Sequence, residues 1–247
     1  MTAEHIPALK QLWQEAFGDP MPVIDAFFAT GFSPDRCNFL LQDGKPVSGL
    51  YWFDCCLDGK KLAYLYAVAT LKSHRGKGLG RKLMEDTHHL LRAQGYAGCI
   101  LVPCCEAVRS WYETLGYRTV TAVAEFSCHA DSKPIPLRKI SAEEYARLRR
   151  EYLPAGGVIQ EDAALDYLLT QGQFYTGDGW LLAGSVENSI FTAQELLGNS
   201  QAAPAILRAL NCTEGRFRTP GTDSPFAMLL PLAADCPVPS YFGLAMD

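Results

Sequence analysis

The sequence predicts an α/β protein in which a mixed central sheet is flanked by helices. The apolar run from Leu62 to Thr70 is typical of a buried strand. Mostly apolar residues then recur at helical spacing, at positions 79, 83, 84, 87, 90 and 91, and this pattern ends at Gly95. A second apolar run, Cys99 to Pro103, is again followed by a helical segment, residues 106–117. Strands that alternate with helices in this way indicate a sheet covered by helices.

A glycine-rich basic loop, residues 75–80, joins the first of these strands to its helix. It reads Arg75-Gly76-Lys77-Gly78-Leu79-Gly80. Backbone N–H groups at a helix N-terminus have no partner within the helix, and the helix dipole favours negative charge there. Four basic side chains add to this field: Arg75, Lys77, Arg81 and Lys82. We therefore expect the loop to bind a phosphate or a pyrophosphate.

The spacing of the glycines narrows the kind of phosphate ligand. A P-loop needs Gly-x4-Gly-Lys-Ser/Thr and a dinucleotide-binding loop needs Gly-x-Gly-x-x-Gly, and residues 75–80 match neither. They match Arg/Gln-x-x-Gly-x-Gly/Ala. In this the chain resembles the GCN5-related N-acetyltransferase (GNAT) superfamily, whose members hold the pyrophosphate of acetyl-coenzyme A in such a loop. A basic surface turn capped by glycines is the alternative interpretation.

A second segment resembles a later motif of the same superfamily, a strand and then a helix that reads roughly Ala-x-x-x-Tyr-x-x-x-Gly-Phe. Its four positions are occupied by Val108, Tyr112, Gly116 and Tyr117. The resemblance covers roughly residues 1–127. It departs from the family where Cys105 or Glu106 replaces a common Asn and where Lys72 replaces a common Pro, and the usual first strand is shortened or missing.

The resemblance implies which residues would bind acetyl-coenzyme A and act on it. The pantetheine arm would lie against backbone groups of two splayed strands that end near residues 68–70 and 102–103. The implied cofactor-binding residues are Val68, Ala69, Thr70, Arg75, Gly76, Lys77, Gly78, Leu79, Gly80 and Arg81. Tyr112 would be the general acid that protonates the departing thiolate. A core aromatic beside Trp111 and Leu115 is the alternative role for Tyr112.

The general base is not identified by the sequence. Glu106 and Glu125 lie near the expected cleft, and His74 precedes the glycine loop. A solvated or structural role is the alternative for each. The run from Tyr241 to Asp247 is apolar and typical of a strand. In relatives among the enhanced intracellular survival proteins the terminal carboxylate serves as a base, so the resemblance offers Asp247, with a purely structural closing strand as the alternative.

Composition and charge bear on the class of protein. The net charge is −5, with 13 Lys/Arg against 13 Asp/Glu through Ala130 and 9 against 14 beyond it. This balance argues against nucleic acid and is compatible with a cationic substrate. No run approaches the ~18 apolar residues of a membrane span and the first residues lack signal-peptide character, so we expect a cytoplasmic protein. The nine cysteines include no Cys-x-x-Cys pair, and both Cys-Cys doublets fall in strand-like segments. We expect mostly buried, reduced thiols and no metal site.

The second half of the chain repeats the order of elements of the first half. After a linker at residues 131–136, a strand at 137–140 leads to a helix that begins with the capping box Ser141 to Glu144. The further expected elements are a helix at 161–170, strands at 173–176, 180–186 and 189–195, a helix at 199–210, and closing strands at 226–230 and 241–245. Residues 197–203 take the place of the glycine loop but contain no Arg and only one Gly, so this copy would bind no coenzyme A.

We therefore predict a catalytic GNAT-like domain at residues 1–130 and a degenerate copy at residues 137–247, with an unrelated α/β domain as the alternative. The predicted reaction moves an acetyl group from acetyl-coenzyme A to a primary amine by direct attack. The acceptor would be a small-molecule, protein or peptide amine, without a nucleic-acid or membrane partner. The second half would shape the acceptor pocket or an interface, and a homodimer is considered. A non-catalytic coenzyme A-binding sensor and a thiol enzyme that uses Cys104 or Cys105 are the alternatives.

Overall fold

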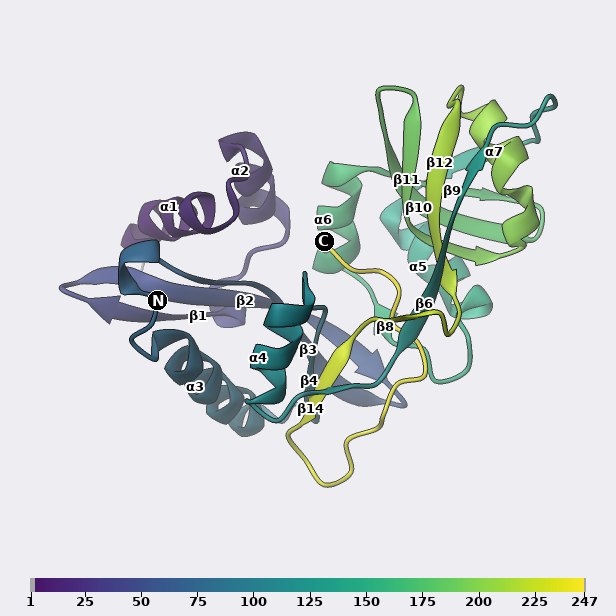
Figure 1. Cartoon of the computed structure of the whole chain (residues 1–247). Helices are drawn as coiled ribbons and strands as arrows, with labels where there is room; N and C mark the ends of the chain where they lie inside the picture. The colour runs from purple at the N-terminus through teal and green to yellow at the C-terminus, as the bar shows by residue number, and fades with distance from the viewer. Residues whose placement is uncertain (1–2, 247) are drawn as a thin grey trace.

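The computed structural model describes residues 3–246 and forms two lobes, each built on a seven-stranded sheet (Figure 1). The strands of the first sheet lie in the order β1-β2-β3-β4-β14-β5, and the short β8 pairs with β2. Their bounds are β1 Cys37–Gln42, β2 Lys45–Leu57, β3 Lys60–Thr70, β4 Gly98–Leu101, β5 Arg118–Thr119, β8 Ile159–Gln160 and β14 Met228–Pro231.

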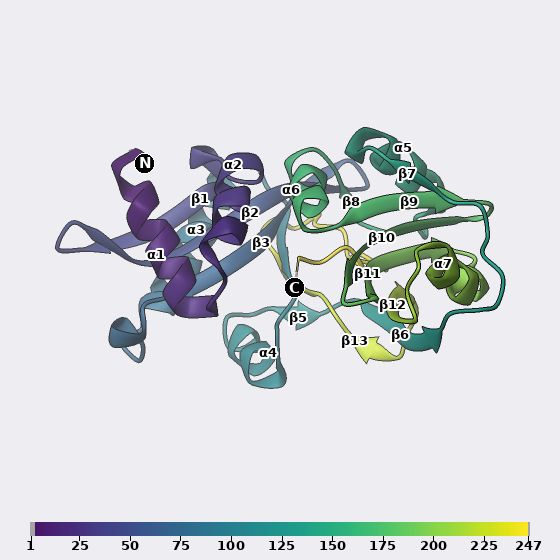
Figure 2. The ribbon, with the colours of Figure 1, turned by 90° about the horizontal axis from the view of Figure 1, so that it is seen from above.

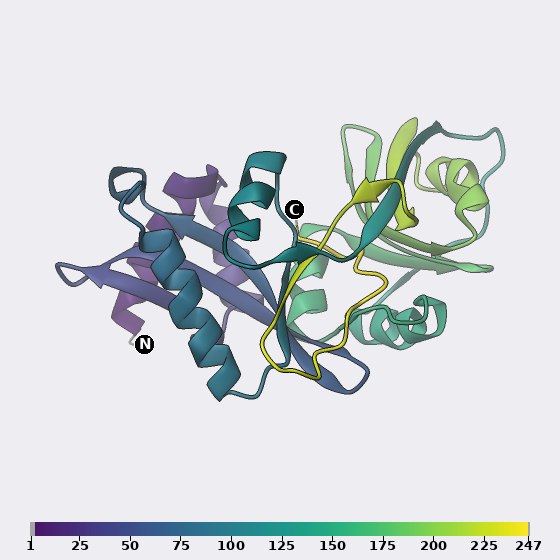
Figure 3. The same ribbon diagram turned by 60° about the horizontal axis from the view of Figure 1, so that its bottom comes forward.

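Helices cover both faces of the first sheet (Figures 1 and 3). They are α1 Ile6–Phe17 and α2 Met21–Thr30 on one face, and α3 Leu79–Ala93 and α4 Glu106–Glu113 on the other. Successive side chains of a strand point to opposite faces, and β2 is buried on both. Tyr51 and Phe53 therefore pack in the core under α1 and α2, whereas Leu50 and Trp52 pack in the core under α3.

The second lobe has the strand order β13-β6-β12-β11-β10-β9-β7. Its strands are β6 Ala122–His129, β7 Arg138–Ile140, β9 Gln173–Gly177, β10 Trp180–Glu187, β11 Ile190–Gly198, β12 Glu214–Pro220 and β13 Ser224–Pro225. Its helices are α5 Ala142–Tyr152, α6 Ala163–Gln171 and α7 Ala203–Ala209, and α7 covers a separate core on one face of the sheet. Short 3-10 helices lie at Ala3–His5, Pro34–Arg36, Lys72–His74 and Ser200–Ala202.

The two lobes have the same connectivity. In the first lobe two helices, three antiparallel strands and a loop lead to α3 and then to β4, which pairs in parallel with β3. In the second lobe α5, α6, β9, β10 and β11 lead to α7 and then to β12, which pairs in parallel with β11. This shared order supports two copies of one fold.

The two halves of the chain exchange strands: β6 joins the second sheet, and β14, like the short β8, joins the first. Strand β6 follows α4 in the chain but pairs with β12 in the second sheet, where Phe126 lies opposite Phe217. Strand β14 comes from the second half but lies between β4 and β5, where Met228 is opposite Leu101 (Figure 1). The chain on each side of the predicted linker, residues 131–136, therefore contributes to both sheets. As a division into domains, the boundary stays a prediction.

Aromatic side chains fill the seam between the lobes. Figure 2 shows α6 of the second lobe beside α2 of the first. Tyr167 of α6 packs against Phe27 of α2 and Phe53 of β2, with ring centroids 5.3 and 6.2 Å apart. The same apolar core contains Tyr241 and Phe242 of the C-terminal segment. The seam is therefore packed like the interior of a domain.

Most of the expected elements are confirmed, including β3, α3, β4, α4 and the order of elements in the second half as far as α7. The capping box is also present, because the Ser141 hydroxyl accepts a hydrogen bond from the Glu144 N–H. Within the described residues no strand precedes α1, as the sequence indicated.

Three expectations about local structure are wrong, and one strand was not expected. Residues 241–245 form no strand; their backbone makes a single bridge between Tyr241 and Gly157. The expected closing strand at 226–230 is β14 of the first sheet, because its apolar edge completes the core beside β4. Strand β12 was not anticipated. Cys104 and Cys105 lie in no strand but are exposed before α4.

Candidate active site

Strands β3 and β4 part and leave a cavity between them. Their parallel pairing covers only Leu62 to Tyr64 of β3, opposite Gly98 to Ile100 of β4, although β3 continues to Thr70. Backbone groups of β3 beyond this point face the gap instead of a neighbouring strand on that side. The cavity has a volume of about 450 Å³. Its walls come from α1, β3, the end of β4, α4 and Met246.

A bulge in β3 accompanies this divergence. The pairing of β2 with β3 shifts register between Gly49 and Tyr51, and Ala67 adopts a positive φ of 49°. Such a bulge re-aims the backbone and increases the local twist of the strand. Ala67 and Val68 both line the cavity, so the sequence-predicted contact residue Val68 lies where the strands open.

The glycine loop at the end of β3 offers unpaired backbone donors. Within the described residues, no backbone or side-chain acceptor pairs with the N–H groups of residues 76–81; the first helical bond is from the Lys82 N–H to the Gly78 carbonyl. Gly76 and Gly78 have φ values of 74° and 77°, in the left-handed region. A side chain at either position would meet no protein atom within 4 Å, so open space adjoins the backbone. These features fit a bound pyrophosphate.

The basic residues of the loop have different tasks. The Arg75 Nε donates to the Thr70 carbonyl at 3.0 Å, and this bond holds the loop against the end of β3. Arg81 turns towards α4 and donates to the carbonyl and hydroxyl of Thr114, at 3.3 and 2.9 Å. Lys77 is exposed and makes no ion pair within the described residues. Arg81 and Lys82 pair with Glu85 and Asp86, at 4.0 and 2.9 Å, whereas Arg75 and Lys77 have no carboxylate partner within the described residues.

Tyr112 lines the cavity from α4. Its side chain is 6% exposed, and its ring makes an edge contact with Tyr117 at 5.5 Å. Burial raises the pKa of the Tyr112 hydroxyl well above its usual range, and the nearby Cys104 adds to this shift. The hydroxyl therefore keeps its proton at neutral pH. Within residues 3–246 it has no hydrogen-bond partner, so its proton is available to a molecule in the cavity.

None of the three candidate bases inside the described residues lines the cavity. Glu106 is exposed and pairs with Arg109 at 3.3 Å, and Glu125 accepts from Arg218 at 3.1 Å on the second sheet. The imidazole of His74 contacts the Ser73 hydroxyl at 2.8 Å. The fourth candidate, Asp247, lies outside the described residues.

Cys104 and Cys105 differ although they are neighbours. Cys104 lines the cavity, and burial raises the pKa of its thiol. Cys105 begins α4, where the backbone N–H of Val108 lowers the pKa of its thiol. Within the described residues no histidine hydrogen-bonds to either sulfur. The arrangement therefore lacks the imidazole that usually activates a catalytic thiol.

The C-terminal segment forms one wall of the cavity. The Met246 N–H donates to the Tyr64 hydroxyl at 3.0 Å, and the Phe242 ring packs on Tyr64 at 4.9 Å. Gln160 donates to the Leu244 carbonyl at 2.7 Å. These bonds hold residues 241–246 in place of a strand ladder. Figure 1 shows this segment returning between the two lobes.

A buried ion pair in the second lobe anchors the start of this segment. Arg149 and Glu195 have side chains 2% and 0% exposed, and their two hydrogen bonds measure 2.6 and 2.9 Å. The Tyr145 and Tyr241 hydroxyls donate to the two Glu195 oxygens. Arg149 also donates to the Val158 carbonyl at 2.9 Å. The pair is therefore fully satisfied and fixes Tyr241.

Sequence reasoning missed the charged residue of the cavity, Asp19. It lies in the turn between α1 and α2, and its carboxylate accepts from the Trp13 Nε1 at 2.7 Å. The only sequence signal was the helix break Gly18-Asp19-Pro20, which indicates a turn and nothing about a cavity. Tyr64, Tyr66 and Met246 were missed for the same reason, because their neighbours are distant in sequence.

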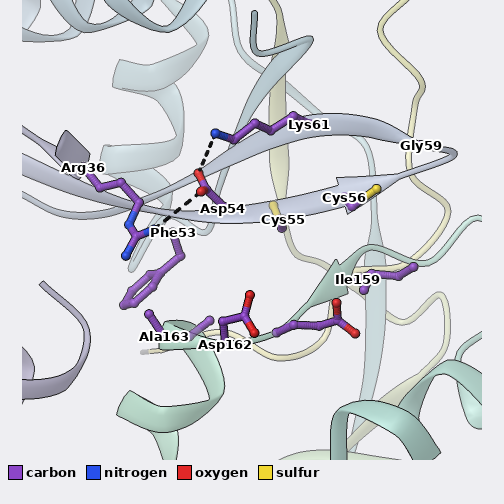
Figure 4. A pocket seen from close by; sticks show the side chains of 12 residues that line it. Arg36, Phe53, Asp54, Cys55, Cys56, Gly59, Lys61, Ile159, Asp162 and Ala163 are labelled. Carbon is purple, nitrogen blue, oxygen red and sulfur yellow. Dashed lines mark ion pairs between the residues drawn. The ribbon is translucent and has the colours of Figure 1, made fainter. Parts of the chain in front are cut away.

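Another cavity, of about 270 Å³, lies at the opposite end of the β2–β3 hairpin (Figure 4). There Asp54 pairs with Arg36 at 3.5 Å and with Lys61 at 3.4 Å, and it accepts a hydrogen bond from Tyr96. The charges that line this cavity on the hairpin side compensate one another. It is also remote from the glycine loop, and we assign it no part in catalysis.

A strand pair that parts around a cavity, beside a glycine loop at a helix N-terminus, defines the acyl-coenzyme A N-acyltransferase fold. Comparison with known proteins agrees with this class. Residues 1–120 match the family model described as acetyltransferase (GNAT) domain. A little under half of the chain, its N-terminal part, is therefore similar to a GNAT acetyltransferase domain.

Solved structures extend the likeness to the second half. A GCN5-related N-acetyltransferase from Kribbella flavida shares 16% identity and a TM-score of 0.71, over 96% of this chain and 71% of that one. Eis1 from Mycobacterium abscessus shares 13% identity and a TM-score of 0.66, over 94% and 72%. A tandem GNAT protein from the clavulanic acid biosynthesis pathway shares 11% identity and a TM-score of 0.58, over 94% and 96%. At these identities the likeness concerns the fold, and the last match agrees with two copies.

Two further observations concern membrane spans and metal sites within the described residues. No helix there combines the length and the apolar character needed to cross a bilayer. No group of His, Cys, Asp or Glu side chains there has the arrangement of a metal site.

Proposed function

We propose that this protein is an N-acetyltransferase that moves the acetyl group of acetyl-coenzyme A to a primary amine by direct attack. The observation that carries the proposal is the cavity between β3 and β4, which is lined by Tyr112 and lies along the strand that leads into the glycine loop. One end of the site thus suits a pyrophosphate, and the other suits a thioester. The second lobe, whose α7 follows no glycine loop, contributes walls and binds no coenzyme A.

The chain's own residues would bind and orient the acyl donor. The N–H groups of residues 76–81 would hold the pyrophosphate, with Arg75 and Lys77 adding positive charge. The backbone at Val68, Ala69 and Thr70 would align the pantetheine arm along β3. The Ala69 carbonyl is already engaged by the Ser48 hydroxyl at 2.9 Å, which stiffens this part of the strand.

In the chemical step the amine nitrogen attacks the thioester carbonyl, a C–N bond forms, the C–S bond breaks, and the nitrogen releases one proton to solvent. The departing thiolate takes a proton from the Tyr112 hydroxyl, which then recovers one from solvent. The high pKa of Tyr112 does not prevent this transfer, because the thiolate forms in the same buried cavity, where desolvation also raises the pKa of the thiol.

Replacing Tyr112 by Phe tests the acid role. The variant keeps the ring and its packing, so coenzyme A affinity should remain while kcat falls by roughly 10²–10⁴-fold. Tyr117→Phe is the matched control: its hydroxyl is equally buried but contacts His88 at 2.9 Å, away from the cavity. Unchanged turnover of Tyr112→Phe across the pH range would show that Tyr112 is a core aromatic without a catalytic role.

Replacing Gly78 by Val tests the loop. Val adds a β-branched side chain in the space next to the N–H groups and should eliminate coenzyme A binding, measured by calorimetry. Gly95→Val carries the same backbone strain, since Gly95 has φ 79° and equally open space, but it lies at the far end of α3. Wild-type affinity in a folded Gly78→Val protein would refute the loop assignment.

An amine panel with thiol detection separates the enzyme from its two rivals. Thiol release with any primary amine, retained in Cys104→Ser and Cys105→Ser, supports direct transfer. Coenzyme A binding without thiol release across the panel would indicate a sensor. Loss of activity in either cysteine variant would indicate a thiol enzyme.

A further inference from the structure

A smaller cavity continues the acyl-transfer cavity into the seam between the lobes. Its volume is about 270 Å³, and it shares Asp19, Tyr66 and Met246 with the larger one. The second lobe supplies most of its remaining wall: Tyr167, Leu168, Gln171, Ser185 and Gln194. A molecule seated there would reach the gap between β3 and β4 past Asp19. Only the larger cavity contains Tyr112, so the smaller one is free for an acceptor.

Asp19 is the only ionised side chain that lines either cavity within the described residues. One of its oxygens accepts the Trp13 Nε1–H, and it makes no ion pair with a described Lys, Arg or His. A carboxylate has about four lone-pair positions, so accepting capacity remains for a ligand.

Aromatic side chains line the two cavities together with this carboxylate. Trp13 meets Tyr66 edge to face at 5.4 Å and Phe17 at 6.1 Å. Tyr66 meets Tyr167 with ring centroids 5.9 Å apart and hydroxyls 3.2 Å apart. A single carboxylate among aromatic faces suits an organic cation, because the charge and the ring quadrupoles both attract an ammonium group.

We propose that Asp19 binds the ammonium form of the acceptor amine at the junction of the two cavities, and that the acceptor is a small organic cation. Its remaining part, seated against the amide and hydroxyl groups of Gln171, Ser185 and Gln194, carries hydrogen-bonding groups. Asp19 is a positioning residue: it recruits the amine next to the thioester, and the ammonium releases its proton to solvent before attack. This inference rests on the proposed function for its chemistry, but its test needs no turnover.

The test is equilibrium binding, measured by calorimetry without acetyl-coenzyme A. The probes are tyramine, 1,4-diaminobutane, the neutral tyramine analogue 4-ethylphenol, and a lysine-containing peptide. We expect at least one of the two small amines to bind the wild type. If tyramine binds, 4-ethylphenol should bind at least 10-fold more weakly. The Asp19→Asn change should lower the affinity for the amine roughly 10–100-fold. The Asn amide can still accept from Trp13, so the turn should stay intact. Asp25→Asn removes an exposed carboxylate of α2 and should bind as the wild type does.

Each outcome decides the proposal. Failure of both small amines to bind, or equal binding to wild type and Asp19→Asn, overturns it. Tighter binding of the peptide than of either small amine overturns the small-molecule assignment. A fall in kcat with unchanged amine affinity in Asp19→Asn would make Asp19 a base instead. If amines bind through Asp19 but no thiol is released from acetyl-coenzyme A, the proposed function fails while this inference stands.

Discussion

Replacing Arg149 by Met should be among the most destabilising single changes in this chain. The guanidinium makes its bonds to Glu195 and Val158 in a part of the core that is closed to solvent. Burial by itself lowers the pKa of Arg149, but the adjacent Glu195 carboxylate raises it above its usual range, so the guanidinium keeps its charge. Met fills similar volume and leaves the Glu195 charge with only the Tyr145 and Tyr241 hydroxyls. Removing one partner of such a pair typically costs about 3–5 kcal/mol.

Urea denaturation followed by tryptophan fluorescence would measure this loss. The double variant Arg149→Met with Glu195→Leu removes both charges and should recover much of the stability, because an apolar pair needs no counterion. Arg147→Met on the same helix is the control, since Arg147 is 62% exposed and should contribute little. A free energy of unfolding within about 0.5 kcal/mol of wild type for Arg149→Met would contradict the reasoning, given the usual scatter of surface substitutions.

Three further predictions concern pH, thiols and the tail. Burial lowers the pKa of His88 from its ordinary value of 6.5 to about 4. The neutral ring therefore contributes stability above pH 6.5, and this contribution is lost as the pH falls from 6.5 towards 4. Thermal unfolding between pH 7.5 and 5 should show a loss of about 1–2 kcal/mol that His88→Gln lacks. Cys105 should be alkylated by iodoacetamide faster than its neighbour Cys104, as peptide mass spectrometry would reveal, because their thiol pKa values are shifted in opposite directions. Deleting residues 246–247 should raise the KM of the amine, since Met246 lines both cavities, with modest effects on stability and kcat; a large loss of kcat at unchanged KM would indicate a catalytic tail.

The parts of the fold that depend on local pattern could be predicted from the sequence. Gly76 and Gly78 adopt positive φ values that glycine allows, so these two residues specify the shape of the loop. The helical spacing of apolar residues likewise specifies α3. The resemblance led us to expect the opening between β3 and β4, but Asp19 and Tyr66 could not be predicted as its walls, because contacts with distant segments place them. The apolar residues around Tyr241 likewise predicted a strand. In the structure a hydrogen bond from the Tyr241 hydroxyl to the buried Glu195 carboxylate holds this residue instead.

The reciprocal exchange of β6 and β14 has a consequence for how the protein is made. While the ribosome is still translating the second half, β4 has no neighbour on its far side, because Met228 to Pro231 complete that edge last. An open apolar edge is a template for pairing with other chains. A chain that stops after the first lobe would therefore be prone to aggregate, and the two copies reach the native state together or not at all.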